Sequence, residues 1–188
     1  MNQSAAETVV VRVDNLLARA LELDGRLSFH CPLLEDPRLA RAGAGTGSRY
    51  RDLAPVLTNP RAGVLAAVRD GRTLAYAVFG PPSAFRRASE LPFVLDEDAL
   101  LIAALYAAPE AREDNLDVDL LLVVLEFARE QGYASVQALG RDDPDVGPEA
   151  RVEMLAATGF QLSGPQSGRW AGLRLGSRAA LDEDEGSA

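Results

Sequence analysis

The side chains best suited to chemistry gather in one short polar stretch, Arg112–Asp119. An unbroken apolar run of strand length, Ala99–Tyr106, comes before it, and Pro109 ends that run. The segment after it, Val118–Gln131, has the apolar spacing of a helix with one broad buried face, and Gly132 is a good C-terminal stop for that helix. Ala134–Leu139 then has the pattern of a further strand. A parallel strand, helix, strand crossover normally binds ligands at its loops, so we expect a binding site at the polar stretch.

Four carboxylates crowd this stretch: Glu113, Asp114, Asp117 and Asp119. Acidic side chains in the first turn of a helix stabilise it, and Asp117 would be a good N-cap for a helix that begins at Val118. Alternatively, Asp114, Asp117 and Asp119 offer the oxygens that a hard cation prefers, although their spacing matches no recognisable cation-binding loop. The capping interpretation is favoured, and we expect no metal.

A second pair of reactive side chains, His30 and Cys31, lies in the segment Phe29–Pro32. Neighbouring residues in an extended chain point to opposite faces, so these two would not act together as base and nucleophile. We expect a solvated histidine and a buried structural cysteine.

The rest of the chain supplies the elements that position the polar stretch. The β-branched run Thr8–Val13 is typical of a first strand, and Asp14 can cap a helix after it. Asp70-Gly71 is a strong signal for a hairpin turn between two strands. The further expected elements are helices over Asn15–Leu23, Tyr50–Leu57 and Glu149–Thr158, hairpin strands over Gly63–Arg69 and Arg72–Phe79, and last strands that begin at Gly159-Phe160 and cover Trp170–Leu175.

Length and composition predict an ordinary soluble globular protein. With 188 residues, of which 47% are hydrophobic and 25% charged, we expect one domain over residues 1–178 and a disordered acidic tail over residues 179–188. The absence of an apolar run of about 18 residues, of a signal-peptide pattern and of any cysteine besides Cys31 favours the cytoplasm. The net charge of −9 argues against general binding to nucleic acid or to an anionic membrane.

The order of these segments resembles the GNAT superfamily, the GCN5-related N-acetyltransferases. In that family a strand ending in Leu-Tyr-Val is followed by Pro, two residues, and then Arg-Gly-x-Gly-x-Gly, which opens a long helix. Leu105–Arg112, Leu-Tyr-Ala-Ala-Pro-Glu-Ala-Arg, is similar to the first part of this motif, and Ala157–Phe160 is similar to the Leu-Gly-Phe that ends motif B. The resemblance covers roughly Val9 to Leu175. It implies an α/β (α+β) fold with a mixed, mostly antiparallel sheet of six or seven strands flanked by helices.

The resemblance also implies acetyl-CoA as the cofactor, held in a splay between the fourth and fifth strands. Backbone groups of Leu105, Tyr106 and Ala107 would pair with its acetyl and pantetheine part. Free N–H groups at the start of the following helix would hold its pyrophosphate. Arg112 would add a positive charge, and Asn115 can replace one glycine because asparagine tolerates left-handed backbone.

The sequence departs from the family at two places. The positions of the three glycines are occupied here by Glu113, Asn115 and Asp117. The two acids among them, together with Asp114, oppose the binding of an anion at the helix start. The tyrosine that often protonates the leaving thiolate corresponds to Leu155, which cannot donate a proton. An amine acceptor also needs a general base, and the candidates near strand ends are Asp142, Asp143 and Glu97.

Two functions follow from the resemblance. The first is an acetyl-CoA dependent N-acetyltransferase that acts on a small-molecule or peptide amine, and the intact strand for the thioester favours it. The second is a catalytically degenerate domain of this fold that serves as a non-enzymatic binding or protein-interaction module, for example as a homodimer. The acidic loop and Leu155 favour the second function. Affinity for acetyl-CoA would separate the two.

Overall fold

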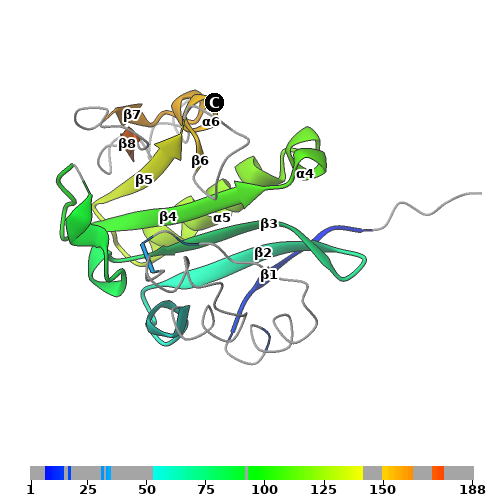
Figure 1. Cartoon of the computed structure of the whole chain (residues 1–188), viewed down its shortest axis with the longest axis horizontal. Coiled ribbons are helices and arrows are strands. Elements are labelled where there is room, and N and C mark those ends of the chain that lie inside the picture. Colours follow the sequence, from blue (N-terminus) through cyan, green and yellow to red (C-terminus); the bar gives the residue numbers. More distant parts are fainter. Residues whose placement is uncertain are drawn as a thin grey trace, which may run out of the picture.

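The computed structural model describes residues 7–14, 17, 31, 33–34, 53–91, 93–141, 150–162 and 171–175. These residues form one eight-stranded sheet in the order β1-β2-β3-β4-β5-β8-β7, with β6 paired to β5 (Figure 1). The strands are β1 (Val9–Arg12), β2 (Gly63–Arg69), β3 (Arg72–Gly80), β4 (Ala99–Ala107), β5 (Ser135–Arg141), β6 (Ala150–Arg151), β7 (Gln161–Leu162) and β8 (Ala171–Leu175). The helices that lie entirely within the described residues are α4 (Pro109–Glu113), α5 (Leu116–Glu130) and α6 (Val152–Ala157), with 3-10 turns at Pro82–Ala84 and Ala88–Glu90.

The pairing of the strands confirms the expected fold class. Only β4 with β5 and β5 with β6 are parallel among the described strands, and the other pairs are antiparallel. The expected strand count of six or seven was wrong, because residues 150–151, which we placed in a helix, form the short strand β6. Helix α6 therefore begins only at Val152.

Two hydrophobic cores lie on opposite faces of the sheet. On one face α5 packs over β2, β3 and β4, and its buried residues Leu120, Leu121 and Val124 meet Leu100 and other strand side chains. Figure 1 shows α5 behind the sheet. The core on the other face joins β2, β3 and β4 to residues 33–34 and 53–57. Because both faces are covered, β4 is buried along nearly all its length, as its unbroken apolar sequence predicts.

The predicted turns are confirmed by the backbone. Asp70 and Gly71 have φ angles of 52° and 70°, the left-handed pair that a tight two-residue hairpin needs. Gly132 ends the central helix with a φ of 69°. Asp14 caps a helical residue, since its Oδ1 accepts a hydrogen bond of 2.7 Å from the N–H of Leu17.

The polar stretch itself is more helical than expected. Between the expected strand and the expected helix, residues 109–113 form the short helix α4, whose first position is Pro109 and which contains no glycine. Helix α5 begins at Leu116 rather than at Val118, and the residue at its N-cap position is Asn115 rather than Asp117. The reason is burial: Leu116 enters the core under α5, so the helix starts early enough to cover it.

Several expectations lie outside the described residues. The expected helix over residues 15–23 is among them, and only Leu17 of that segment is described. The others are His30, Asp142, Asp143 and the acidic tail over residues 179–188. In the described part of the chain, no helix has the length and hydrophobicity needed to cross a bilayer.

Candidate functional site

The parallel strands β4 and β5 pair at one end and separate at the other. Their pairing runs from Ala99 and Ser135 to Ile102 and Ala138, although β4 continues to Ala107 and β5 to Arg141. In Figure 1 the two arrows diverge toward their tips. In the described part of the chain, the edge of β4 that faces β5 therefore has no strand partner from residue 103 onward.

A bulge in β4 stands where the pairing stops. On its other edge β4 pairs with β3, and this register places Phe79 opposite Ile102 but Val78 opposite Ala104. Ala103 is thus an extra residue in β4. A bulge bends and twists the strand that carries it, which explains why β4 leaves β5 immediately after Ile102. The bulge and the end of the parallel pairing together create the splay.

Strand β6 lies on the β4 side of β5, within the splay. Gly140 pairs with Ala171 of β8 on one edge of β5 and with Ala150 of β6, so β6 must occupy the opposite edge, which β4 has left. Contacts between β4 and β6 agree with this placement. Two residues of β6 therefore cover the β5 side of the splay and leave the β4 side without a strand.

An ion pair joins β6 to the first turn of α5. Arg151 donates from Nη2 and Nε to Oδ2 of Asp117, at 2.7 and 3.2 Å. The other carboxylate oxygen, Oδ1, accepts from the N–H of Val118 at 3.1 Å. The Asp117 side chain is only 4% exposed, whereas the Arg151 side chain is 32% exposed. A fully paired carboxylate thus occupies the positive end of α5, where a bound anion would be favoured.

The backbone at the start of α5 retains donors. Asn115 has a φ of 57°, so this position takes the left-handed conformation that asparagine tolerates. The N–H groups of Leu116 and Asp117 have no hydrogen-bond acceptor among the described residues. In α4, by contrast, the N–H groups of Ala111 and Arg112 both bond to the carbonyl of Ala108. Two consecutive N–H groups without an acceptor in the described part of the chain therefore lie at the start of α5.

Arginines from β2 and β3 pair with two more acids near this helix start, Asp114 and Glu110. Asp114 forms an ion pair of 2.6 Å with Arg69 on β2, and Glu110 lies 3.6 Å from Arg72 on β3. Because Asp114 and Asp117 face different arginines, the carboxylates do not converge as a cation site would require. Within the described ranges, no group of three or more acids, histidines and cysteines could hold a metal ion.

The predicted cofactor-binding residues lie along the open edge and at its end. Leu105 and Ala107 are buried under α5, and Tyr106 is half-buried on the other face, where its ring stacks on Tyr76 at 5.4 Å. Arg112 donates from Nε to the carbonyl of Ala107 at 3.0 Å. The structure thus brings Leu105, Tyr106, Ala107, Arg112 and Asn115 to one end of β4, and their role in binding stays a prediction.

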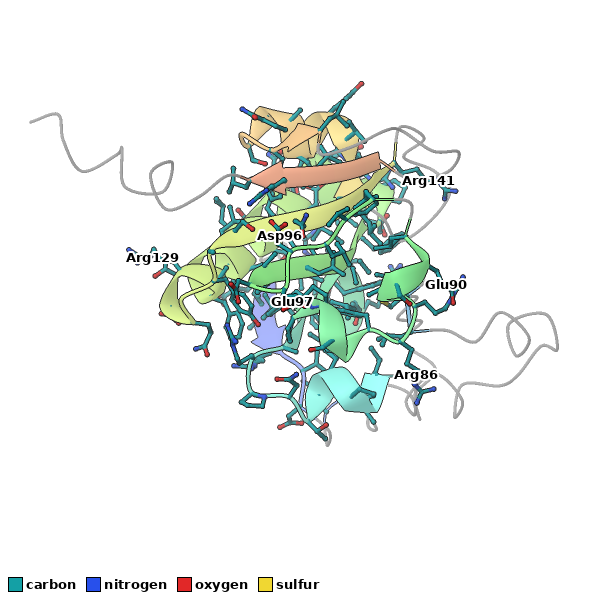
Figure 2. All side chains as sticks on the ribbon, turned by 90° about the vertical axis from the view of Figure 1, so that its left-hand side faces the viewer. Arg86, Glu90, Asp96, Glu97, Arg129 and Arg141 are labelled. Atoms are coloured by element: carbon teal, nitrogen blue, oxygen red, sulfur yellow. The ribbon has the colours of Figure 1, made fainter. Side chains whose placement is uncertain are left out.

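The predicted general bases are not gathered at the splay. Glu97 is exposed and lies before the first residue of β4, at the end where β4 and β5 are paired. Figure 2 looks onto that end and shows Glu97 beside Asp96. From Glu97 to the open edge at Ala103 the strand rises by roughly 20 Å. Asp142 and Asp143 follow β5 at the open end but lie outside the described residues.

Two other predicted positions are structural. Leu155 is completely buried in the core between α6 and the sheet, where it supplies packing and no proton. Cys31 is buried at 2% exposure, as expected for a structural cysteine.

Arg151 and Arg69 are the site residues that sequence reasoning missed. Nothing in the local sequence marks either one, because their partners lie 34 and 45 residues away. The one available signal was indirect: a buried first-turn acid such as Asp117 needs a positive partner, and the chain had to supply it from another element.

Comparisons with solved structures show the fold. PaiA N-acetyltransferase from Thermoplasma acidophilum, solved with coenzyme A, is 12% identical with a TM-score of 0.58 over 89% of this chain and 98% of its own. Aminoglycoside N-acetyltransferase AAC(6′)-Iy, solved with CoA, is 12% identical with a TM-score of 0.57 over 89% and 97%. The ribosomal-protein-S18-alanine N-acetyltransferase from Escherichia coli is 11% identical with a TM-score of 0.50 over 89% and 91%.

No protein-family model and no curated protein matches the chain. The match to the PaiA structure covers 89% of this chain. The chain has the fold of the GNAT N-acetyltransferases.

Proposed function

We propose that this protein is an acetyl-CoA dependent N-acetyltransferase that transfers the acetyl group directly to an amine. The observation that carries the proposal is the splay: β4 and β5 stop pairing at Ile102 and Ala138 while both strands continue. Backbone groups on a strand edge without a partner strongly favour a new hydrogen-bonding partner. An extended amide chain such as pantetheine can supply that partner.

The residues at the end of the splay fit a thioester with an anionic tail. The acetyl and pantetheine part would lie along residues 103–107, and the pyrophosphate would lie at the free N–H groups of Leu116 and Asp117. The acids of this region do not exclude an anion, because Arg69 and Arg151 offset the charges of Asp114 and Asp117. Crystal structures of PaiA and of AAC(6′)-Iy with coenzyme A support the same cofactor here.

The chemistry requires a base and a proton donor. The neutral amine attacks the thioester carbonyl, the carbon–sulfur bond breaks, and the amine proton and the thiolate must be handled by the enzyme or by water. Leu155 cannot protonate the thiolate, so we propose that water does so. Asp142 and Asp143 remain the proposed bases because they follow β5 at the open end of the splay, whereas Glu97 lies at the closed end.

The proposal is tested by supplying acetyl-CoA and a panel of amines and measuring free thiol. The panel should contain an aminoglycoside, a peptide with an N-terminal alanine and a polyamine, since amines of different size and charge separate the acceptor classes. We expect thiol release that depends on the amine for at least one class, with a product heavier by one acetyl group. Binding of acetyl-CoA without transfer to any amine would favour the non-enzymatic alternative.

A further inference from the structure

The ion pair of Asp117 and Arg151 lies where the anionic part of acetyl-CoA would bind. We propose that Arg151 is a ligand of the cofactor pyrophosphate, and that Asp117 holds this arginine until the cofactor replaces it. The inference rests on the proposed function and adds to it one binding residue and one internal competitor. Both nitrogens of the Arg151 fork contact the same oxygen, Oδ2 of Asp117, so a single oxygen has to be replaced.

Guanidinium groups make the exchange chemically reasonable. The planar fork of arginine binds carboxylate and phosphate with the same donor geometry. Arg151 is the more exposed partner, with 32% of its side chain accessible against 4% for Asp117. An anion that arrives from solvent can therefore reach the guanidinium without first uncovering the carboxylate.

Asp117 can lose Arg151 without being left alone. Its Oδ1 accepts the N–H of Val118 at 3.1 Å, and the carboxylate stays at the positive end of α5. Only Oδ2 depends on the arginine. Breaking the pair therefore costs less than it would for a carboxylate whose other oxygen has no donor.

The pair also controls the position of β6 in the splay. Strand β6 consists of Ala150 and Arg151, which pair with Gly140 and Arg141. The ion pair connects one of these two residues, Arg151, to α5. If the pyrophosphate replaced the Asp117 carboxylate as the partner of Arg151, β6 would be connected to the cofactor instead of to α5. Cofactor binding thus uses β6 as one wall of the site.

The test compares affinity for acetyl-CoA and for acetyl-pantetheine, which lacks the pyrophosphate, by titration calorimetry on the full chain. The variant Asp117→Asn keeps the side-chain size and removes the competing charge. We expect it to bind acetyl-CoA about tenfold more tightly, since one charge-assisted contact is commonly worth about that factor. Arg151→Gln should weaken binding of acetyl-CoA about tenfold, both alone and in the Asp117→Asn background. Acetyl-pantetheine should bind all these variants equally.

Asp114→Asn is the matched control. Asp114 lies near the same helix start and has its own arginine, Arg69, at 2.6 Å, so its substitution removes one negative charge without releasing Arg151. We expect a change of less than about twofold, because this carboxylate is half exposed and its field is screened. Arg151→Lys keeps the charge and loses the fork, and it should bind acetyl-CoA with intermediate affinity.

The outcomes separate the inference from the proposed function. If the unmodified chain binds acetyl-CoA but Asp117→Asn behaves like Asp114→Asn, or Arg151→Gln has no effect in folded protein, the inference is overturned and the acetyltransferase proposal stands. If neither the unmodified chain nor any variant binds acetyl-CoA, both fail. Unfolding of each variant followed by circular dichroism identifies a change that acts only through stability.

Discussion

Arg151 and Asp117 lie 34 residues apart in the sequence, and the guanidinium Nη2 of one is 2.7 Å from the carboxylate Oδ2 of the other. The contact joins the strand in the splay to the first turn of the helix that borders it. A helix that began at Val118 with Asp117 as its N-cap would have used this carboxylate locally. Instead the carboxylate is buried, and only its Oδ1 accepts a local N–H, that of Val118, while Oδ2 faces another element. A tertiary contact thus helps to define the start of α5.

Loss of Arg151 should destabilise the fold. Arg151→Met keeps most of the aliphatic stem but leaves a carboxylate of 4% exposure without its cation, and we expect the free energy of unfolding to fall by about 1–3 kcal/mol. Urea denaturation measures this change. Arg129→Met is the control, since Arg129 pairs with Glu126 on the exposed side of α5 and its loss should cost less than about 1 kcal/mol. Equal effects of the two substitutions would contradict the structural role of the buried pair.

The left-handed backbone at Asn115 can be tested by substitution with glycine and with alanine. Its φ of 57° is easy for glycine and strained for residues with a Cβ other than asparagine and aspartate. Asn115→Gly should therefore leave the free energy of unfolding unchanged within about 0.5 kcal/mol, whereas Asn115→Ala should lower it by about 1 kcal/mol. Thermal unfolding of the two variants side by side gives the answer. An alanine variant as stable as the glycine variant would show that α5 starts elsewhere.

Gly140 allows β5 to pack closely against its neighbours at the open end of the splay. A Cβ at this position would lie 2.4 Å from Cδ1 of Leu173 and 2.9 Å from Cγ2 of Val152. Gly140→Ala should cost about 1–3 kcal/mol of folding free energy through overpacking. At Gly132 a Cβ would meet no atom within 4 Å, and only the φ of 69° opposes alanine there, at about 1 kcal/mol. The urea midpoints of unfolding of the two variants are compared with that of the unmodified chain. A midpoint that falls further for Gly132→Ala than for Gly140→Ala would contradict the packing argument.

Tyr133 should make stability fall at alkaline pH. Burial raises the pKa of its phenol above the ordinary value of 10.0, and the nearby Arg61 lowers that pKa by a smaller amount. The folded chain then holds a proton that the unfolded chain has lost. This contribution is complete below about pH 10 and disappears as pH rises toward the folded-state pKa.

Tyr133→Phe isolates that effect. The substitution also removes the hydrogen bond of 2.6 Å from the phenol to the carbonyl of Arg61, which lowers stability at every pH. The unfolding free energy of the unmodified chain should therefore exceed that of the variant at about pH 9, and the difference should shrink by about pH 11. Urea titrations at both values decide the matter. A difference that stays constant or grows would contradict the assignment.

Local patterns in the sequence predicted most of the scaffold. The hairpin at Asp70-Gly71, the buried strand β4 and the helix stop at Gly132 depend on short-range chemistry, and the structure confirms all three. The left-handed backbone at Asn115 was predicted for the same reason. Each is decided by a few neighbouring residues, so one sequence is enough to recognise it.

The features missed at the site depend on contacts between distant segments. The bulge at Ala103 depends on the register of β4 against β3, and strand β6 exists only because β5 offers it a free edge. The pairing of Asp117 with Arg151 needs both features in place. Sequence reasoning treated the acids as a cluster that opposes an anion, whereas the fold pairs two of them, Asp114 and Asp117, with arginines from other strands.

Amide hydrogen exchange with and without acetyl-CoA shows whether the cofactor occupies the splay, as we propose. We expect slower exchange for those amides of residues 103–107 that β3 does not already bond, and for residues 116–118 at the start of α5. Strand β1, Val9–Arg12, lies at the far edge of the sheet and serves as the internal control, with unchanged exchange. If a millimolar concentration of acetyl-CoA left residues 103–107 and 116–118 unprotected, the splay would not be the cofactor site.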